Sequence, residues 1–588
     1  MLFEAVAKYY EKLEGTSSRL AMIDVLSEML KEADKDEIKK LVYMTQGVLA
    51  PPFEGVQVGI AEKFAEHAIS IATGYEQAQV LQSYKKLGDL GLTAGEFAGK
   101  TKLRGLRRTK FEVTYVFDTI LKIANTSGSG SQDMKIKMLV ELLGASSPLE
   151  ARYIMRFALG ELRLGAGDAT ILEALSKAYT GDREFKVKLE GAYNMCGDLG
   201  KVADVLVRKG KEGIENFKVS LFNPIRPALA ERLPTAEEIL EKMKGKCSVE
   251  SKYDGLRAQV HISKAKGRVE IFSRNLERLT PMFPEIAKAA LKEVNAREAI
   301  FEGEAIAYND ATKEFRPFQE TIQRKRKHGI EELSEQMPLH LFAFDLMYLD
   351  GVDYTNLPYE KRRRKLESIV EGDGTIRFSD MIIATTAKEI DKYFEQMVGN
   401  GLEGIVAKDL NSPYVAGARK FSWIKLKRSY KGELSDTVDL VIVGYYVGRG
   451  VRAEFGFGGL LTATYNEKTD IFETITRIGT GFTEANMKMF KELLDHHKSK
   501  KKPARVNAVV EPDFWVDPEF VVEVRADEIT RSPMHTCGRD GGEEGYALRF
   551  PRIVSDGVRG DKKPEDATTT KEIIEMFGMQ KRIRVADS

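Results

Sequence analysis

The spacing of apolar residues changes twice along this chain, and each change separates one class of fold from the next. Up to about residue 215, apolar residues recur at helical spacing. From about residue 246 they form short runs that are broken by turns, and after Trp423 the runs are strand-like and bounded by glycine. A single core cannot follow all three patterns, so we expect a helical domain, a mixed α/β domain and a small β-domain in that order.

Length, charge and cysteine usage agree with a modular intracellular protein. The 588 residues exceed the roughly 250–300 at which one core stops growing. Charged residues make up 30% yet cancel to a formal charge of +1, and none of the three cysteines lies in a CxxC pair. This excludes a wholly basic DNA-coating protein and argues against a zinc knuckle or a disulfide scaffold. Because we find no leader and no apolar stretch of about 18 residues, we expect a soluble cytoplasmic protein, associated with the nucleoid.

The first domain is expected to be all-helical, because Phe3, Val6 and Tyr10 illustrate a helical apolar period. The two prolines of Phe222–Pro227 oppose helix and predict an extended connector. We therefore place domains at residues 1–218, 219–427 and 428–588.

Strand-like runs and helical patterns predict the fold of the other two domains. Five or so strands in the last domain fit a small β-barrel of the oligonucleotide-binding (OB) type, with a terminal helix and a basic tail. The predicted strands cover residues 257–262, 268–272, 299–308, 340–347, 438–447, 459–465, 472–478 and 520–525, and the predicted helices cover 387–399, 484–496 and 569–579.

Lys252 lies between an acid and a guanidinium, in the octad Glu250–Arg257. A lysine attacks phosphorus only as the neutral amine, whereas an exposed lysine, with a pKa of about 10.4, is protonated at neutral pH. Arg257, Lys425, Lys427 and a bound metal would disfavour the ammonium form. Taken alone, the KxDG pattern is more often an ordinary surface lysine beside a turn.

Acidic, basic and aromatic residues downstream suggest partners for a nucleotide. Glu302, Glu304 and Glu403 lie in or beside apolar runs, where a carboxylate needs a cation. We expect Glu304 and Glu403 to bind magnesium, and the alternative is that each pairs with a lysine or arginine. Strand alternation would direct both Lys425 and Lys427 towards an α-phosphate, although such lysines are usually solvated. Phe344 is expected to stack on a purine, or else to be an ordinary core residue.

In their order, five charged islands resemble the covalent nucleotidyltransferase superfamily of ATP-dependent DNA ligases and mRNA capping enzymes. The resemblance implies that Lys252 forms the covalent bond to AMP and that Glu250 contacts adenine. It also implies ring stacking by Phe344 and ribose and phosphate contacts by Arg257 and Arg274. The islands are Glu250–Arg257, Phe301–Glu304, Phe342–Asp345, Glu403–Lys408 and Trp423–Lys427.

The segment Gly545–Arg552 resembles the last ligase motif, which implies that Arg552 contacts the β and γ phosphates of ATP. The chain departs from the commoner pattern after it, because a longer link precedes Arg559 and Lys562. The resemblance therefore assigns these two residues no firm role.

Small residues at Gly128, Ser129 and Gly130 resemble the DNA-contacting turn of archaeal and eukaryotic ligases, and would let backbone amides approach a phosphate. The alternative is a plain interhelix linker. The same family resemblance implies DNA contacts by three arginines, Arg152, Arg156 and Arg163. A relaxed phosphate-loop match at Ala94–Thr101 lacks the preceding strand that such a loop needs, so we do not assign that function to it.

Together these features resemble an archaeal-type replicative DNA ligase. The resemblance implies ATP and Mg²⁺ as cofactors, with Mn²⁺ as a substitute, and nicked duplex DNA as the substrate in replication, repair and recombination. A monomer is expected, and a sliding clamp is a candidate partner, although no glutamine-led clamp box occurs near residues 100–115. The hinge for domain motion is expected at residues 427–434. The rival interpretations are a capping enzyme or RNA ligase, and a non-catalytic DNA-binding clamp.

Overall fold

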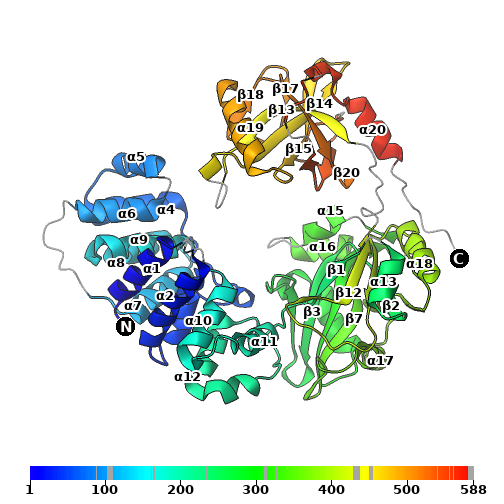
Figure 1. The fold of residues 1–588 in the computed structure, drawn as a ribbon, viewed down its shortest axis with the longest axis horizontal. Coiled ribbons are helices and arrows are strands. Elements are labelled where there is room, and N and C mark those ends of the chain that lie inside the picture. The colour runs from blue at the N-terminus through cyan, green and yellow to red at the C-terminus, as the bar shows by residue number, and fades with distance from the viewer. Residues whose placement is uncertain are drawn as a thin grey trace. The chain divides into compact units, whose positions relative to one another are not determined.

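The fold is described from a computed structural model (Figure 1). Its described residues are 1–16, 18–87, 89–101, 110–160, 162, 164, 166–233, 235–309, 314–316, 318–324, 329–427, 437–448, 454–499, 501–539, 541–554, 557–560 and 562–579. They form two compact units. The first comprises Met1–Glu231, Leu240–Thr385 and Val406–Ile424, and the second comprises Arg232–Ile239, Thr386–Ile405 and Lys425–Ser588.

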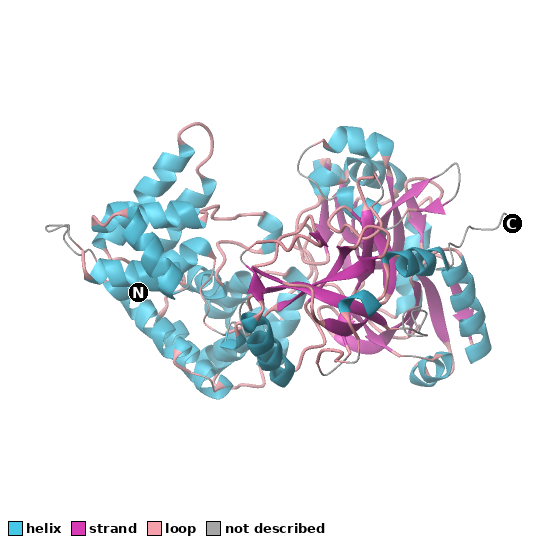
Figure 2. Ribbon diagram, turned by 90° about the horizontal axis from the view of Figure 1, so that it is seen from above, coloured by secondary structure: helices cyan, strands magenta, loops and turns pink. Residues whose placement is uncertain are grey.

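The N-terminal part of the first unit is helical, as predicted (Figure 2). Its core is built from the apolar faces of the helices, and Phe3, Val6 and Tyr10 of α1 are fully buried in it. The helices are α1 (Phe3–Glu14), α2 (Arg19–Glu32), α3 (Ile38–Gln46), α4 (Glu62–Thr73), α5 (Gln77–Leu87), α6 (Leu90–Gly99), α7 (Val113–Asn125), α8 (Ser131–Ala145), α9 (Pro148–Leu159), α10 (Asp168–Thr180), α11 (Lys186–Cys196) and α12 (Leu199–Glu215).

The described residues between 229 and 427 form two sheets with helices, which confirms the mixed α/β prediction. One sheet has the order β1-β12-β11-β2-β10, and the other has the order β4-β3-β5-β7-β8, with β6 on β5 and β9 on β7. The strands are β1 (Leu229–Arg232), β2 (Cys247–Lys252), β3 (Leu256–Ser263), β4 (Arg268–Ser273), β5 (Glu298–Asn309), β6 (Glu314–Phe315), β7 (Leu339–Leu349), β8 (Val352–Asp353), β9 (Ile376–Phe378), β10 (Met381–Ala384), β11 (Gly404–Lys408) and β12 (Arg419–Lys427).

Helices α14 and α17 contribute Ile286, Ala290 and Leu366 to the hydrophobic core of the seven-stranded sheet. Ile225 of the extended connector and Ala228, which directly follows the connector, belong to a separate cluster, together with Ile300 of β5 and others. The helices of this part of the chain are α13 (Ala236–Lys242), α14 (Pro284–Glu293), α15 (Phe318–Thr321), α16 (Ile330–Gln336), α17 (Tyr359–Ile369) and α18 (Ala387–Gly399).

The second unit is rich in strands after residue 437, as predicted for the C-terminal domain. Strand β13 pairs with β14 along one edge and with β19 and β18 along the other, and β20 and β21 form a separate hairpin. The elements are β13 (Val438–Tyr446), β14 (Gly459–Asn466), β15 (Ile471–Ile478), α19 (Glu484–His496), β16 (Lys498–Ser499), β17 (Val506–Asn507), β18 (Phe514–Val516), β19 (Val521–Arg525), β20 (Glu528–Ser532), β21 (Gly545–Arg549), β22 (Arg552–Ile553) and α20 (Thr570–Met579).

The predicted domain boundaries remain predictions. The first compact unit includes residues on both sides of the boundary predicted at 218, and residues 428–436, which hold most of the predicted hinge, lie outside the described residues. The basic tail lies outside them as well. Among the described residues, no helix combines the length and apolarity needed to cross a membrane.

His261 of β3 is fully buried, and burial lowers its pKa to about 3, from an ordinary value near 6.5. Between pH 6.5 and 3, His261 is protonated in the unfolded chain but stays neutral in the folded chain. The folded state therefore loses stability as the pH falls from 6.5 towards 3. On lowering the pH from 7 to 4.5, this histidine should reduce the free energy of unfolding of the first unit by about 2–3 kcal/mol. His261→Gln should remove that part of the decrease.

Urea unfolding at the two pH values measures this difference. The chain has two tryptophans, so a Trp515→Phe background leaves Trp423 to report on the first unit alone. Equal acid sensitivity with and without His261 would contradict the prediction.

Candidate nucleotide and DNA site

Lys252 is the last residue of β2, and β3 begins four residues later in the other sheet. The octad that contains Lys252 therefore spans the crossing between the two sheets. The lysine is half-buried, whereas Tyr253 beside it is buried and stacks on Phe342, with ring centroids 4.5 Å apart. The hydroxyl of Tyr253 accepts a hydrogen bond from the backbone N–H of Asp380, at 3.4 Å. Tyr253 thus anchors the turn beside Lys252 in the core.

Two glycines of the islands are required by close packing of strands. A Cβ atom at Gly255 would lie 2.6 Å from the carbonyl oxygen of Ala305, and one at Gly303 would lie 2.8 Å from the carbonyl oxygen of Phe342. Real Cβ contacts do not come this close, so any side chain would push β3 from β5, or β5 from β7. The glycines keep the turn after Lys252 close to Glu304.

Glu250, the predicted adenine contact, is buried in a network that sequence reasoning did not predict. Its carboxylate pairs with Lys408 Nζ at 2.9 Å and accepts a hydrogen bond from the Tyr359 hydroxyl. Burial, and then the charge of Glu250, raise the pKa of Tyr359 well above its usual value, so this hydroxyl remains a donor. Both partners of Glu250 are far from it in sequence. Of the two, only Lys408 was part of a recognised sequence motif, the Glu403–Lys408 island.

Lys408 is surrounded by aromatic rings. Its ammonium lies 4.3 Å from the ring centroid of Trp423, 4.5 Å from that of Phe344 and 4.7 Å from that of Tyr359. Burial lowers the pKa of Lys408, and the Glu250 carboxylate opposes that shift. The lysine compensates the buried charge of Glu250, and cation–π attraction adds to that pairing.

Arg257 is held on the same side of the seven-stranded sheet as Glu302. Its guanidinium donates to Glu302 Oε2 at 2.6 Å and to the carbonyl of Ala228 at 2.8 Å, and the Tyr414 hydroxyl donates to the same Glu302 oxygen at 2.7 Å. The expectation that Glu302 needs a cation is confirmed. Arg257 Nε is buried without a hydrogen-bond partner among the described residues.

Phe344 lies in a β-bulge. The register of β5 and β7 jumps between Glu302 opposite Asp345 and Gly303 opposite Ala343, which leaves Phe344 as the extra residue. Bulges re-aim side chains next to functional sites. The ring is half-buried and meets Trp423 edge-to-face, with centroids 5.9 Å apart. Behind the bulge, Asp345 forms a fully buried ion pair with Arg362.

Two further predicted residues of the first unit are Glu304, in β5, and Arg274, just after β4. Glu304 is half-buried and directly opposite Arg257 in the β3–β5 pair. Arg274 is exposed and follows the last residue of β4. The structure thus brings Glu250, Arg257 and Phe344 together around Lys408 and Trp423.

In the second unit, Glu403 forms an ion pair with Lys427. In this structure Glu403 thus has the lysine partner that was the alternative to magnesium binding. The predicted strand alternation of Lys425 and Lys427 is confirmed, because both lie in β12 and are half-buried while Leu426 between them is buried. Gly404 has no room for a side chain, since a Cβ atom would lie 2.1 Å from the carbonyl oxygen of Leu426.

The two predicted metal ligands, Glu304 and Glu403, supply carboxylate oxygens, which Mg²⁺ prefers. Across the described ranges, no group of three or more His, Cys, Asp and Glu side chains is placed to hold a metal. Magnesium commonly uses one or two carboxylates together with substrate phosphates, so each of these two side chains, taken by itself, is of a type that binds an ion arriving with a nucleotide.

Arg552 is exposed, forms part of β22 and pairs with Asp527 at 3.2 Å. Arg559 and Lys562, whose roles were left open, both pair with Asp439, at 3.3 and 2.6 Å. These contacts give the last two residues a structural role within the second unit.

The predicted DNA-contacting turn precedes helix α8. Gly128 and Gly130 have φ angles of +93° and +76°, in the left-handed region that favours glycine, and both have open space where a side chain would be. Gly128, Ser129 and Gly130 are exposed. This geometry leaves the backbone of the turn accessible, as the prediction requires.

The arginines of α9 are engaged inside the helical part. Arg156 is buried and donates to both oxygens of Asp89, and Arg152 pairs with Glu14 at 2.6 Å. Glu14 also pairs with Arg156, at 2.7 Å. These contacts hold α9 against α1 and α6, a structural role that the sequence did not predict. Arg163 lies outside the described residues.

The phosphate-loop match does not form a phosphate loop. Most of it lies within helix α6, and Lys100, which follows, pairs with Glu96 at 2.6 Å. Its small residues serve helix packing instead, because a Cβ atom at Gly95 would lie 2.9 Å from the carbonyl oxygen of Pro148. Residues 102–109, the basic stretch after it, lie outside the described residues.

Three family descriptions match the chain in order along its length. They are the DNA ligase N terminus over residues 2–176, the ATP dependent DNA ligase domain over residues 227–427 and the ATP dependent DNA ligase C terminal region over residues 453–562.

Curated relatives match end to end. A probable DNA ligase of Dictyoglomus thermophilum is 48% identical over 588 residues, covering 100% of this chain and 99% of the relative. A DNA ligase of Saccharolobus solfataricus is 42% identical over 597 residues, covering 100% of this chain and 98% of the relative. The solved structure titled Pmar-Lig_PreS3 covers 94% of this chain and 99% of its own, with a TM-score of 0.54 and 18% identity, which indicates a similar fold.

Proposed function

Because the chain belongs to the family of ATP-dependent DNA ligases, we propose that it seals nicks in duplex DNA through an AMP group carried on Lys252. The observation that carries this proposal is the position of Lys252. It ends β2 where the chain crosses between two sheets, two residues after the buried carboxylate of Glu250.

The reaction proceeds in three transfers. Neutral Lys252 Nζ attacks the α-phosphorus of ATP, so that an N–P bond forms and the bond to pyrophosphate breaks. An oxygen of the 5′-phosphate at the nick then attacks the same phosphorus, and Lys252 leaves. Finally the 3′-hydroxyl attacks the activated 5′-phosphate, loses its proton and expels AMP. Positioning and cationic groups supply most of the acceleration in such transfers.

Glu250 gives a physical reason for choosing adenine. Lys408 and Tyr359 both donate to its carboxylate, which therefore stays an acceptor. A carboxylate accepts from the amino group of adenine but would repel the carbonyl oxygen of guanine. The half-buried ring of Phe344 then stacks on the base, and Arg257 contacts the ribose and phosphates.

The remaining predicted residues complete the nucleotide site in this proposal. Arg274 contacts the ribose or phosphates, and Lys425 and Lys427 hold the α-phosphate. Bound Mg²⁺, or Mn²⁺ in its place, would be held by Glu304 and Glu403 and would neutralise phosphate charge.

For DNA, we propose that the exposed turn at Gly128–Gly130 contacts a backbone phosphate through its amides. The protein would act as a monomer in the cytoplasm, in replication, repair and recombination, and a sliding clamp remains a candidate partner.

The test of the proposed function is covalent labelling. The full chain is mixed with magnesium and α-labelled ATP, denatured and examined for label, with GTP and NAD in parallel. Label from ATP that moves on to a nicked duplex supports ligation, and label from GTP alone would indicate a capping enzyme. A chain that binds DNA in a salt-sensitive way but takes no label would be a DNA clamp.

Arg552→Ala should slow self-adenylation by about 10²-fold, because the exposed guanidinium would no longer offset charge on the departing pyrophosphate. Sealing of a pre-adenylated nick, which releases no pyrophosphate, should change little. The matched control is Arg539→Ala, which removes an arginine that donates to the carbonyl of Gly542. Equal losses in the two reactions would count against this role. A point variant is preferable to ending the chain near residue 545, because that cut removes β21 from its hairpin with β20.

A further inference from the structure

The connector before β1 is hydrogen-bonded to two buried side chains of β3. His261 Nδ1 accepts from the backbone N–H of Phe222 at 3.0 Å. The side-chain amide of Gln259 accepts from the N–H of Ile225 at 2.7 Å and donates to its carbonyl at 2.9 Å. Gln259 and His261 also bond to each other, with Nε2 and Oε1 2.9 Å apart.

The same network continues to the nucleotide site. Gln259 Nε2 donates to Glu302 Oε1 at 3.1 Å, and Glu302 Oε2 accepts from Arg257 at 2.6 Å. Gln259 is directly opposite Glu302 in the β3–β5 register, and strand alternation places Arg257, Gln259 and His261 on one face of β3. The guanidinium is thereby connected to the connector backbone through two side chains.

Each polar side-chain atom of Gln259 and His261 has one consistent role. Because Nδ1 of His261 accepts from a backbone N–H, its proton must lie on Nε2, which donates to Gln259. The Gln259 oxygen then accepts twice and its amino group donates twice. Two buried side chains that are both fully hydrogen-bonded specify one arrangement, whereas removing either one leaves several buried polar groups unpaired.

The connector itself is held in an uncommon conformation. Phe222 has a φ angle of +67°, which is costly for a residue other than glycine. Its backbone N–H bonds to His261, and its ring lies 4.1 Å from the Arg268 guanidinium. Surrounding contacts must therefore maintain this turn.

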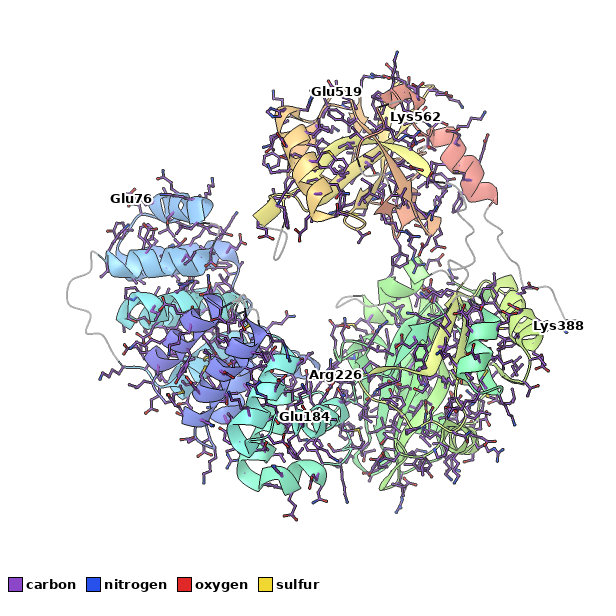
Figure 3. The ribbon with its side chains drawn as sticks, viewed as in Figure 1. Glu76, Glu184, Arg226, Lys388, Glu519 and Lys562 are labelled. Atoms are coloured by element: carbon purple, nitrogen blue, oxygen red, sulfur yellow. The ribbon has the colours of Figure 1, made fainter. Side chains whose placement is uncertain are left out.

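The other side of the connector contacts the helical part. Arg226, labelled in Figure 3 where the helices meet the sheets of the first unit, donates its backbone N–H to the carbonyl of Asn194 at 2.8 Å. Its guanidinium lies 4.6 Å from the ring centroid of Tyr193. Both partners belong to α11, so one short segment bonds to a helix on one side and to β3 on the other.

We infer that Gln259 and His261 are positioning residues for Arg257. They transmit the position of the connector through Glu302 to the guanidinium that contacts ATP. Arg257 also donates to the carbonyl of Ala228, which directly follows the connector, at 2.8 Å. This part of the chain therefore contacts the Arg257–Glu302 pair twice, once directly at Arg257 and once through Gln259 at Glu302. This inference rests on the proposed function, because its effect is on ATP use.

A double-mutant cycle in the full chain tests the inference. Gln259→Met should raise the ATP concentration that half-saturates self-adenylation about tenfold, while the maximal rate changes little. In an Arg257→Ala background the same change should add less than about twofold, because its target is gone. The matched control is Ser263→Ala, on the same face of β3, equally buried, with an Oγ that has no partner among the described residues.

A second variant keeps the test decisive if Gln259→Met does not fold. His261→Gln retains a donor to Gln259 but loses the acceptor for Phe222, and it should raise the same concentration about threefold. Equal effects with and without Arg257, or an effect of Ser263→Ala as large as that of Gln259→Met, would overturn the inference. Absence of label on the wild-type chain would instead overturn the proposed function.

Discussion

Lys252→Ala is expected to abolish covalent labelling by ATP, with a loss of at least about 10⁴-fold, because no other group replaces a missing nucleophile. Ligation that starts from ATP should fall by the same factor. The measurement is label retained on the denatured chain after incubation with magnesium and α-labelled ATP.

The control for this result is a nick that already carries AMP on its 5′-phosphate. Sealing it requires no attack by Lys252, so the variant should still seal it, within roughly a hundredfold of the wild type. Lys246→Ala, which removes an exposed lysine just before β2, should label normally. If the wild type takes label and the Lys252 variant labels equally well, the AMP is carried on another residue.

Lys408→Met should destabilise the first unit by about 3–5 kcal/mol, because it leaves the buried carboxylate of Glu250 without its cation. The same variant should label poorly with ATP, since the Glu250 carboxylate loses one of the two donors that hold it in place. Urea unfolding followed through Trp423 in a Trp515→Phe background measures the loss of stability.

A second substitution separates stability from recognition. Adding Glu250→Gln to Lys408→Met removes the unpaired charge and should recover most of the stability, but not the preference for ATP over GTP. Lys266→Met, which changes an exposed lysine of the same unit, should alter neither. If Lys408→Met were as stable as the wild type, Glu250 would not depend on that ion pair.

Elements of secondary structure were predictable because their signal is local. Helix α18 begins and ends at the predicted residues, and strands β3, β5 and β7 begin and end within two residues of the predicted runs. Apolar periodicity is set by neighbours along the chain, so it survives without knowledge of the fold.

Partners of the predicted site residues were not predictable, because they come from distant positions. Nothing near Tyr359 or Tyr414 indicates that the first donates to Glu250 and the second to Glu302. The buried network of Arg156 was likewise missed, because an arginine in a helix gives the same local signal whether it faces solvent or Asp89.

The order and spacing of the charged islands were sufficient, by themselves, to indicate the family, and the spacing of apolar residues indicated the sequence of fold classes, because both depend on residue identity along the chain. The same islands single out Lys252 as the residue that we propose to carry AMP. Tertiary structure decided which charges are compensated: Glu250 by Lys408, Glu302 by Arg257, and Arg257 in turn by its link to the connector. The physical reason is that a buried charge persists only beside a partner, and long-range folding determines which residue that partner is.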